Sequence, residues 1–119
     1  MKNFRKFSLQ SPLLGKTYQV EFAWLQNAIS IRHSDTVDVK FFVTDGDRTL
    51  ERVVALPHAV LRKLCQELGR ELTDPWCSRL AALHLKWMFE SGTDIEKAIS
   101  TPTEAQLREY AHQLARPSE

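Results

Sequence analysis

Hydrophobic and polar positions alternate along the segment from Thr17 to Leu56. The apolar positions are mostly β-branched or aromatic, which is typical of strands with one buried face. They are Tyr18, Val20, Phe22 and Trp24, expected on one face, then Ile29 and Ile31, and then Val37, Val39, Phe41 and Val43. Parallel strands would instead read as continuous apolar runs joined by helical crossovers. The pattern therefore predicts an antiparallel sheet of about four strands over residues 17–56.

The clearest hairpin is centred on Gly46 and Asp47. A two-residue type II′ loop with Gly46 at its first central position fixes the pairing of the two flanking strands. The expected pairs are Asp45 with Arg48, Val43 with Leu50, Val39 with Val54, and Val37 with Leu56. Phe41 then lies opposite Arg52, which is acceptable if the arginine stem lies along the ring. A slip by one residue, with Phe41 opposite Glu51, would mix the faces only moderately and is the alternative register.

After Leu56 the hydrophobic period becomes helical. Pro57 is acceptable as a first helical residue, and apolar residues then recur at three- and four-residue spacing. They are Val60, Leu61, Leu64, Cys65 and Leu68. Gly69 supplies the left-handed residue that commonly ends a helix. These signals predict a helix over residues 58–68.

A second helix is expected over residues 75–90. Asp74 can serve as its N-cap, and Pro75 suits the first helical position. Its apolar side chains cover more than one stripe; they are Leu80, Ala81, Leu83, Leu85, Trp87, Met88 and Phe89. A helix that is apolar over so much of its circumference is usually the central one, packed on a sheet and on other helices at once.

Two further helix starts are indicated by threonine and glutamate at the spacing of a capping box. The pairs are Thr93 with Glu96, for a helix over residues 94–99, and Thr101 with Glu104, for a helix over residues 102–115. The last helix has a single apolar face, which is formed by Leu107, Tyr110, Ala111 and Leu114. We expect this face to dock either on the core of the chain itself or on a second subunit.

These elements predict an α+β fold in which a sheet half precedes a helical half. The helices over 58–68, 75–90, 94–99 and 102–115 are expected to pack on one sheet face. A length of 119 residues is usual for one domain, so we expect a single domain over residues 1–119. The apolar fraction of 43% and the charged fraction of 26% are those of ordinary globular chains. Residues 1–16 are expected to form either a basic N-terminal arm or a short first strand.

The net charge does not favour nucleic acid as a main partner. The chain carries a formal charge of +1 and has a pI near 7.8, whereas domains that neutralise phosphates usually have a pI above about 9. Residues 1–20 nevertheless hold four cations and no acid, namely Lys2, Arg5, Lys6 and Lys16. The simplest interpretation is a solvated basic tail, and the alternative is an arm that contacts phosphates.

The two cysteines indicate a reducing compartment. Cys65 and Cys77 both fall in predicted helices among apolar neighbours, where a free cysteine behaves as a small hydrophobic residue. No apolar run approaches the roughly 20 residues of a membrane span. The stretch from Phe4 to Leu14 is interrupted by charged, polar and proline residues, so no signal-peptide core is expected. We expect a cytoplasmic protein with no membrane contact.

No constellation of residues commits the chain to catalysis, and no metal or other cofactor is expected. Cys77 and His84, like His58 and Cys65, are seven residues apart, which places the members of each pair about 10 Å apart along a helix. Ligand pairs of structural zinc sites are usually much closer in sequence. Cys77, near a predicted helix N-terminus, is the more reactive thiol candidate, although packing in the core is the simpler interpretation. A cleft built from His33, His58, His84 or Cys77 is beyond sequence patterns and stays open.

Residues 58–90 loosely resemble a helix-turn-helix whose second helix would read DNA. The connection from Arg70 to Asp74 is longer than the usual tight turn, and the second helix is too apolar to lie in a groove. An ordinary helical hairpin is therefore favoured. A DNA-binding regulator is the alternative function, and its phosphate contacts would be Lys2, Arg5, Lys6, Arg70, Arg79 and Lys86.

Large aromatic rings are numerous for a chain of this size. Phe42 falls on the opposite sheet face from Phe41, so it is exposed if helices cover one face only. A solvent-facing aromatic side chain is a usual anchor for a partner. We therefore predict a non-enzymatic interaction or adaptor domain that binds a protein partner or a second copy of itself through the free sheet face or the C-terminal helix. The residues to test are Phe42, Trp24 and Tyr110.

Overall fold

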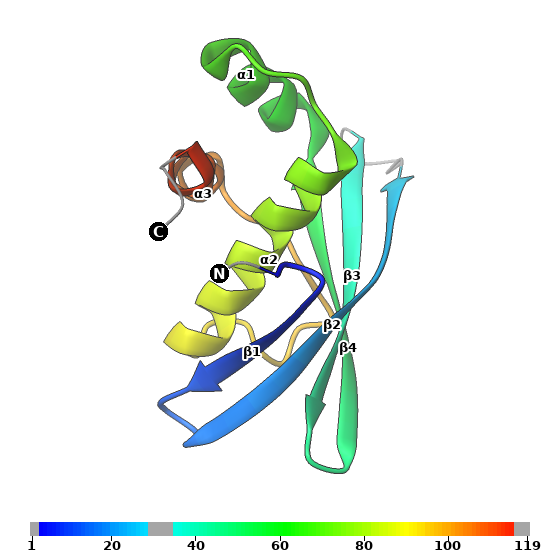
Figure 1. Ribbon diagram of the computed structural model, residues 1–119, viewed down its shortest axis with the longest axis vertical. Coiled ribbons are helices and arrows are strands. Elements are labelled where there is room, and N and C mark those ends of the chain that lie inside the picture. Colours follow the sequence, from blue (N-terminus) through cyan, green and yellow to red (C-terminus); the bar gives the residue numbers. More distant parts are fainter. Residues whose placement is uncertain (1–2, 29–34, 116–119) are drawn as a thin grey trace.

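The computed structural model describes residues 3–28 and 35–115, which form the α+β fold that the change of hydrophobic period predicts (Figure 1). The elements are β1 (Lys6–Ser11), β2 (Lys16–Ala28), β3 (Thr36–Asp45), β4 (Arg48–Pro57), α1 (His58–Leu68), α2 (Asp74–Ser91), β5 (Ile99–Ser100) and α3 (Glu104–Ala115). Residues 6–11 pair with β2, so this segment is a short first strand rather than a free arm. Ile29 and Ile31, which we expected in the sheet, lie outside the described residues.

The strands form one sheet in the order β1-β2-β3-β4-β5. Neighbouring strands from β1 to β4 are antiparallel, and β5 pairs with β4 in parallel. The predicted hairpin register is confirmed, since Asp45 pairs with Arg48, Val43 with Leu50, Phe41 with Arg52, Val39 with Val54 and Val37 with Leu56. Gly46 has φ 59°, and Asp47 is not among the described residues with positive φ. This combination is typical of the type II′ turn.

A β-bulge in β2 changes the face on which the strand presents its side chains. Phe22 pairs with Phe41 on the helix side of the sheet, whereas Trp24 pairs with Lys40, with Ala23 between them as the extra residue. The expectation that Trp24 shares a face with Phe22 is therefore wrong. The extra residue shifts the alternation by one position, so Trp24 lies on the outer face of the sheet.

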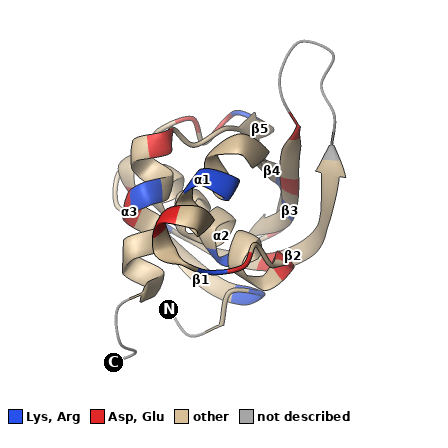
Figure 2. Ribbon diagram, turned by 90° about the horizontal axis from the view of Figure 1, so that it is seen from above, with Lys and Arg blue, Asp and Glu red and all other residues tan. Residues whose placement is uncertain are grey.

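The helices pack on one face of the sheet, as predicted, with α2 against the strands and α3 on the far side of α2 (Figures 1 and 2). One hydrophobic core joins the strands to all three helices. The buried side chains of α2 are Trp76, Cys77, Leu80, Ala81, Ala82, His84, Leu85, Met88 and Phe89. They cover most of the circumference, which confirms α2 as the central helix. Its N-cap is Thr73 rather than Asp74, because the Thr73 hydroxyl accepts a hydrogen bond from the backbone N–H of Trp76 at 3.4 Å.

The helix expected over residues 94–99 is absent, and this prediction is wrong. The N–H of Thr93 bonds to the carbonyl of Met88 and so belongs to the end of α2. Asp94 has φ 55°, which ends any helix there. The following backbone joins the sheet instead, since the N–H of Val53 donates to the carbonyl of Ala98 at 2.8 Å and Ile99 begins β5. Six residues give too few intrahelical bonds to compete with such pairing.

Arg52 of β4 binds the segment between α2 and β5 through a hydrogen bond. Its Nε donates to the carbonyl of Ile95 at 2.9 Å, and its Nη1 donates to the carbonyl of Glu51 at 2.8 Å. Partial burial lowers the pKa of Arg52, and the two carbonyl acceptors satisfy part of the hydrogen-bonding capacity of its guanidinium. The expected position of Arg52 opposite Phe41 is confirmed, and its head group holds the chain between α2 and β5.

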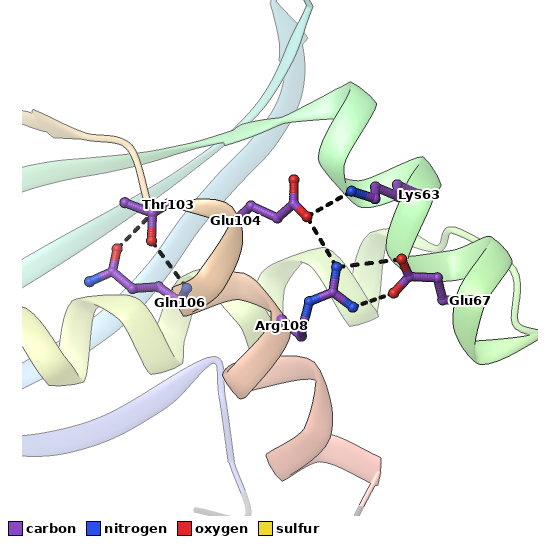
Figure 3. Close-up of polar contacts among 6 residues, drawn as sticks. All are labelled: Lys63, Glu67, Thr103, Glu104, Gln106 and Arg108. Atoms are coloured by element: carbon purple, nitrogen blue, oxygen red, sulfur yellow. Dashed lines mark hydrogen bonds and ion pairs between the residues drawn. The ribbon is translucent and has the colours of Figure 1, made fainter.

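The last helix begins at Glu104, two residues later than expected, because the capping box is formed by other residues. Thr103 and Gln106 cap each other: the Thr103 N–H donates to Gln106 Oε1 at 2.9 Å, and the Gln106 N–H donates to Thr103 Oγ1 at 3.1 Å (Figure 3). The apolar face of α3 docks on the core of this chain, with Leu107, Tyr110 and Ala111 buried. The alternative in which this face meets a second subunit is thus excluded.

An ion network ties α3 to α1 (Figure 3). Glu104 accepts from Lys63 Nζ at 2.9 Å and from Arg108 Nη2 at 3.1 Å, and Arg108 also pairs with Glu67. These partners lower the pKa of both glutamates. The network lies at the surface, where ion pairs add little to the stability of a fold. Its main effect is therefore to orient α3 relative to α1. Within the described residues, none of the helices is long and apolar enough to cross a membrane.

Candidate functional site

Apolar side chains gather on the sheet face opposite the helices. We call this set the outer-face patch; it consists of Trp24 on β2, Phe42 on β3, Val53 on β4 and Ile99 on β5. Trp24 is 36% exposed, Phe42 is 38% exposed and Ile99 is 61% exposed. The register joins them, since Trp24 pairs with Lys40, Lys40 with Val53 and Val53 with Ile99. The patch is therefore one row across four strands, with Phe42 beside it.

Lys40 lies at the centre of the outer-face patch. Its Nζ is 5.7 Å from the centroid of the Trp24 ring and 5.4 Å from that of the Phe42 ring, and it forms an ion pair with Glu51. A cation held between two rings restricts the motion of both. The patch thus combines partly exposed aromatic rings with a charge that is already paired.

The charges of this face are nearly balanced. Cross-strand pairing places Lys6 beside Glu21, Glu21 beside Phe42 and Phe42 beside Glu51. Together with Lys40 and Asp38 these positions carry two cations and three carboxylates, a net charge of −1. A face of this kind does not select strongly for one sign of charge.

Tyr110, which we expected on an interaction surface, is buried and forms part of an internal network. His84 Nδ1 lies 2.9 Å from the Tyr110 hydroxyl, and His84 Nε2 lies 3.1 Å from Ser100 Oγ. All three residues are at most 7% exposed. Tyr110 therefore offers no surface to a partner, and the network joins α2, α3 and β5 instead.

Burial sets the protonation of this network. It lowers the pKa of His84 to about 4 and raises the pKa of Tyr110 to about 12. The imidazole is thus neutral at physiological pH, and both of its nitrogens have partners. Sequence patterns did not identify Ser100, because it lies on a short parallel strand between two segments expected to be helical.

Those residues considered for catalysis that the structure describes do not meet in one cavity. Cys77 is buried in the first turn of α2, where burial, reinforced by the nearby Asp74 carboxylate, raises the pKa of its thiol to about 12. Packing in the core, the simpler interpretation, is therefore the one that holds for Cys77. His58 begins α1, whereas His84 is in the interior. His33 lies outside the described residues, among which no three potential metal ligands gather.

A cleft of about 670 Å³ opens where the N-terminal segment crosses β2 and the start of α2. We call it the N-terminal cleft; its lining consists of Asn3, Phe4, Arg5, Phe22, Leu25, Asp74, Pro75, Ser78 and Arg79. The Arg5 guanidinium lies over the Phe22 ring at 4.9 Å, and the Arg79 guanidinium lies over the Phe4 ring at 5.7 Å. Two cations from distant parts of the sequence therefore share one cavity.

The other residues considered for DNA binding are dispersed. Arg70 lies over the Trp76 ring at 4.7 Å, and Lys86 pairs with Glu90 at 4.0 Å. Lys6 begins β1 and pairs in register with Glu21, while Lys2 lies outside the described residues. The proposed reading helix α2 is packed between the sheet and α3 (Figure 1), and most of its circumference is buried, so only a narrow stripe of it is left to face a groove.

The chain matches no protein-family model, no curated protein and no solved structure. Its candidate sites are the outer-face patch and the N-terminal cleft. Sequence patterns identified Phe42 and Trp24 but not Ile99, and Arg5 and Arg79 but not the cleft that they share. The missing information was in each case tertiary, since parallel pairing and cavity walls join residues that are far apart in sequence.

Proposed function

We propose that this chain is a non-enzymatic interaction domain that pairs with a second copy of itself through the outer-face patch. The observation that carries this proposal is the outer-face patch, whose apolar side chains come from four strands and in which Trp24 and Phe42 are each more than one third exposed. Single exposed apolar residues are ordinary, but neighbouring aromatic rings on an uncovered sheet face are typical of interfaces. Two such faces can stack as the sheets of a β-sandwich do.

The near balance of charge favours a second copy as the occupant. A symmetric interface brings the same surface patch together twice, so the patch has to be complementary to itself. A strongly acidic or basic face would repel its copy, whereas two cations among three carboxylates allow opposite charges to meet. The apolar face of α3 is buried in its own core, so of the two surfaces that the sequence suggested for pairing, only the sheet face stays exposed.

Sedimentation velocity of the full chain tests this proposal over a concentration series from about 1 μM to about 500 μM. We expect a monomer–dimer equilibrium that Trp24→Ala and Phe42→Ala each weaken by roughly tenfold or more, because aromatic anchors dominate such interfaces. Leu72→Ala is the matched control, since Leu72 is also 36% exposed but lies between α1 and α2. It should leave the equilibrium unchanged.

Two outcomes would contradict the proposal. A strict monomer at the highest concentration would show that a second copy does not occupy the patch. A dimer that persists in the Trp24→Ala and Phe42→Ala variants would place the interface elsewhere. Circular dichroism of each variant ensures that a lost dimer does not reflect a lost fold, and exposed positions are expected to tolerate alanine.

A further inference from the structure

The N-terminal cleft holds two arginines that make no ion pair with any described residue. The seven ion pairs of the described chain involve other cations, and Arg5 and Arg79 are in none of them. Arg108, by contrast, pairs with two glutamates. The guanidiniums of the cleft therefore keep their N–H donors available to a ligand.

Ring contacts hold both guanidiniums in place. Arg5 lies over Phe22 at 4.9 Å, and Arg79 lies over Phe4 at 5.7 Å. An arginine whose guanidinium lies over a ring still has N–H groups to donate to a phosphate or a carboxylate. The backbone of Arg5 is also fixed, because its N–H donates to Asn3 Oδ1 at 2.9 Å. This arrangement reduces the ordering that a bound anion would require.

The helix end contributes little to anion binding, so the side chains have to supply it. The Trp76 N–H donates to Thr73 Oγ1 and the Cys77 N–H donates to the Thr73 carbonyl, while Pro75 has no N–H. The first turn of α2 thus has few free donors. Asp74 adds one carboxylate to the two arginines, which leaves a net positive cleft.

The remaining walls suit a flat apolar group with hydroxyls. Phe4, Phe22, Leu25 and Pro75 provide apolar surface, and Ser78 and Asp74 provide polar atoms at the α2 wall. A volume of about 670 Å³ is in the range of small-molecule sites. Carboxylates commonly accept hydrogen bonds from sugar hydroxyls in nucleotide sites.

We propose that the N-terminal cleft binds a phosphate monoester that carries a flat ring system, which is the chemistry of a nucleoside monophosphate. Arg5 and Arg79 bind the phosphate through charge-assisted hydrogen bonds. The ring system packs against the apolar wall of Leu25 and Pro75, and Asp74 accepts from a hydroxyl of the sugar. This site is independent of the outer-face patch, since it lies on the helix side of the sheet.

Isothermal titration of the full chain with adenosine monophosphate, adenosine and inorganic phosphate tests the site. We expect adenosine monophosphate to bind more tightly than either fragment, because only the nucleotide fills both parts of the cleft. Arg5→Gln and Arg79→Gln should each weaken it by roughly tenfold or more. Arg62→Gln, which removes an exposed arginine of α1, is the control and should change nothing.

A further pair of variants separates charge from geometry. Arg79→Lys keeps the charge but loses the planar guanidinium that can donate two parallel hydrogen bonds, so its affinity should fall between those of the wild type and Arg79→Gln. Uridine monophosphate should bind as well, since the proposed contacts are to the phosphate and to the flat face of the ring and do not distinguish one base from another. Circular dichroism of every variant establishes that the fold is retained.

Three results would overturn this inference. The first is the absence of binding heat with either nucleotide at a ligand concentration of about 1 mM, because a preformed site for this ligand should have a lower Kd than that. The second is equal affinity for adenosine monophosphate in the wild type and in both glutamine variants. The third is equal affinity for inorganic phosphate and the nucleotide, which would leave an unspecific anion site without a ring pocket.

Discussion

Burial of the His84 ring between α2, α3 and β5 keeps it neutral and gives it a structural rather than a catalytic position. Its two nitrogens reach the Tyr110 hydroxyl at 2.9 Å and Ser100 Oγ at 3.1 Å, and its ring stacks on Trp87 with the centroids 5.5 Å apart. A protonated ring would have to replace one accepted hydrogen bond with a donated one. The fold therefore depends on the neutral form.

The stability of the fold should fall as the pH drops, because His84 binds a proton more readily in the unfolded chain. Burial lowers its pKa to about 4 in the folded state, whereas histidine in an unfolded chain titrates near 6.5. The contribution is fully present above about pH 6.5 and is lost progressively toward about pH 4. We expect a decrease on the order of 2 kcal/mol in the free energy of unfolding across this window.

Urea unfolding at several pH values measures this decrease. His84→Gln retains a donor and an acceptor but does not titrate, so its stability should vary much less between about pH 6.5 and 4.5. Glu67 and Glu104 also have lowered pKa values, so their protonation also reduces the stability of the fold. This loss occurs in both proteins and in more acid solution than the loss from His84. If the stability of the wild type and of His84→Gln varied with pH in the same way, His84 would not be the source of the pH dependence.

At the scale of elements, the bulge in β2 determines which side chains form each candidate site. Phe22 lines the N-terminal cleft, and Trp24 belongs to the outer-face patch on the opposite side of the sheet. In a regular strand, where Ala23 would be an ordinary paired position, residues 22 and 24 would share a face. One inserted position thus separates two aromatic residues that sequence alternation places together.

Deletion of Ala23 should therefore preserve the fold. Phe22 already pairs with Phe41, and Trp24 already pairs with the next residue, Lys40, so removing the bulge joins two stretches that are in register. We expect a cost of about 1 kcal/mol or less, since only a local kink is lost. Thermal unfolding and the dispersion of amide signals in a heteronuclear NMR spectrum measure the outcome.

Deletion of Gln19 from the same strand is the control for the Ala23 deletion. Gln19 lies in the regular part of β2, where it pairs with Ser8 and Thr44. Its removal moves the preceding residues, including Tyr18, to the opposite face. We expect this variant to lose most of its folded signal. Equal damage from the two deletions would contradict the assigned role of the bulge.

At the scale of the whole molecule, elements held by interactions between residues close in sequence could be predicted, and those held by distant contacts could not. The β3–β4 hairpin was predicted with its register because turn chemistry and alternation, both local, agree. The α2 prediction succeeded for the same reason, since its apolar pattern is contained in one segment. Each signal could be read within about 20 residues of sequence.

Features that depend on distant contacts were not predictable. The segment after α2 has capping residues for a short helix, yet pairing with β4 satisfies its backbone instead. The cleft between Arg5 and Arg79 joins parts of the chain that are 74 positions apart. No pattern within one segment of the sequence indicates that these two residues line the same cleft. Tertiary context also buried Tyr110, whose spacing on α3 is equally compatible with an interface.

The sheet half and the helical half share a single core, so neither should fold alone. Val39, Phe41 and Val54 in the strands are 0% exposed, as are Leu80 and Leu85 of α2. A fragment of residues 1–57 would expose the whole apolar face of the sheet. We expect this fragment to lack dispersed amide signals and protection against hydrogen exchange. An equimolar mixture with a fragment of residues 58–119 should restore both, because the cut falls between β4 and α1 and leaves the core residues intact. A fragment 1–57 that unfolds cooperatively by itself would mean that the strands are stable without α2. The claim that the two halves depend on one shared core would then be wrong.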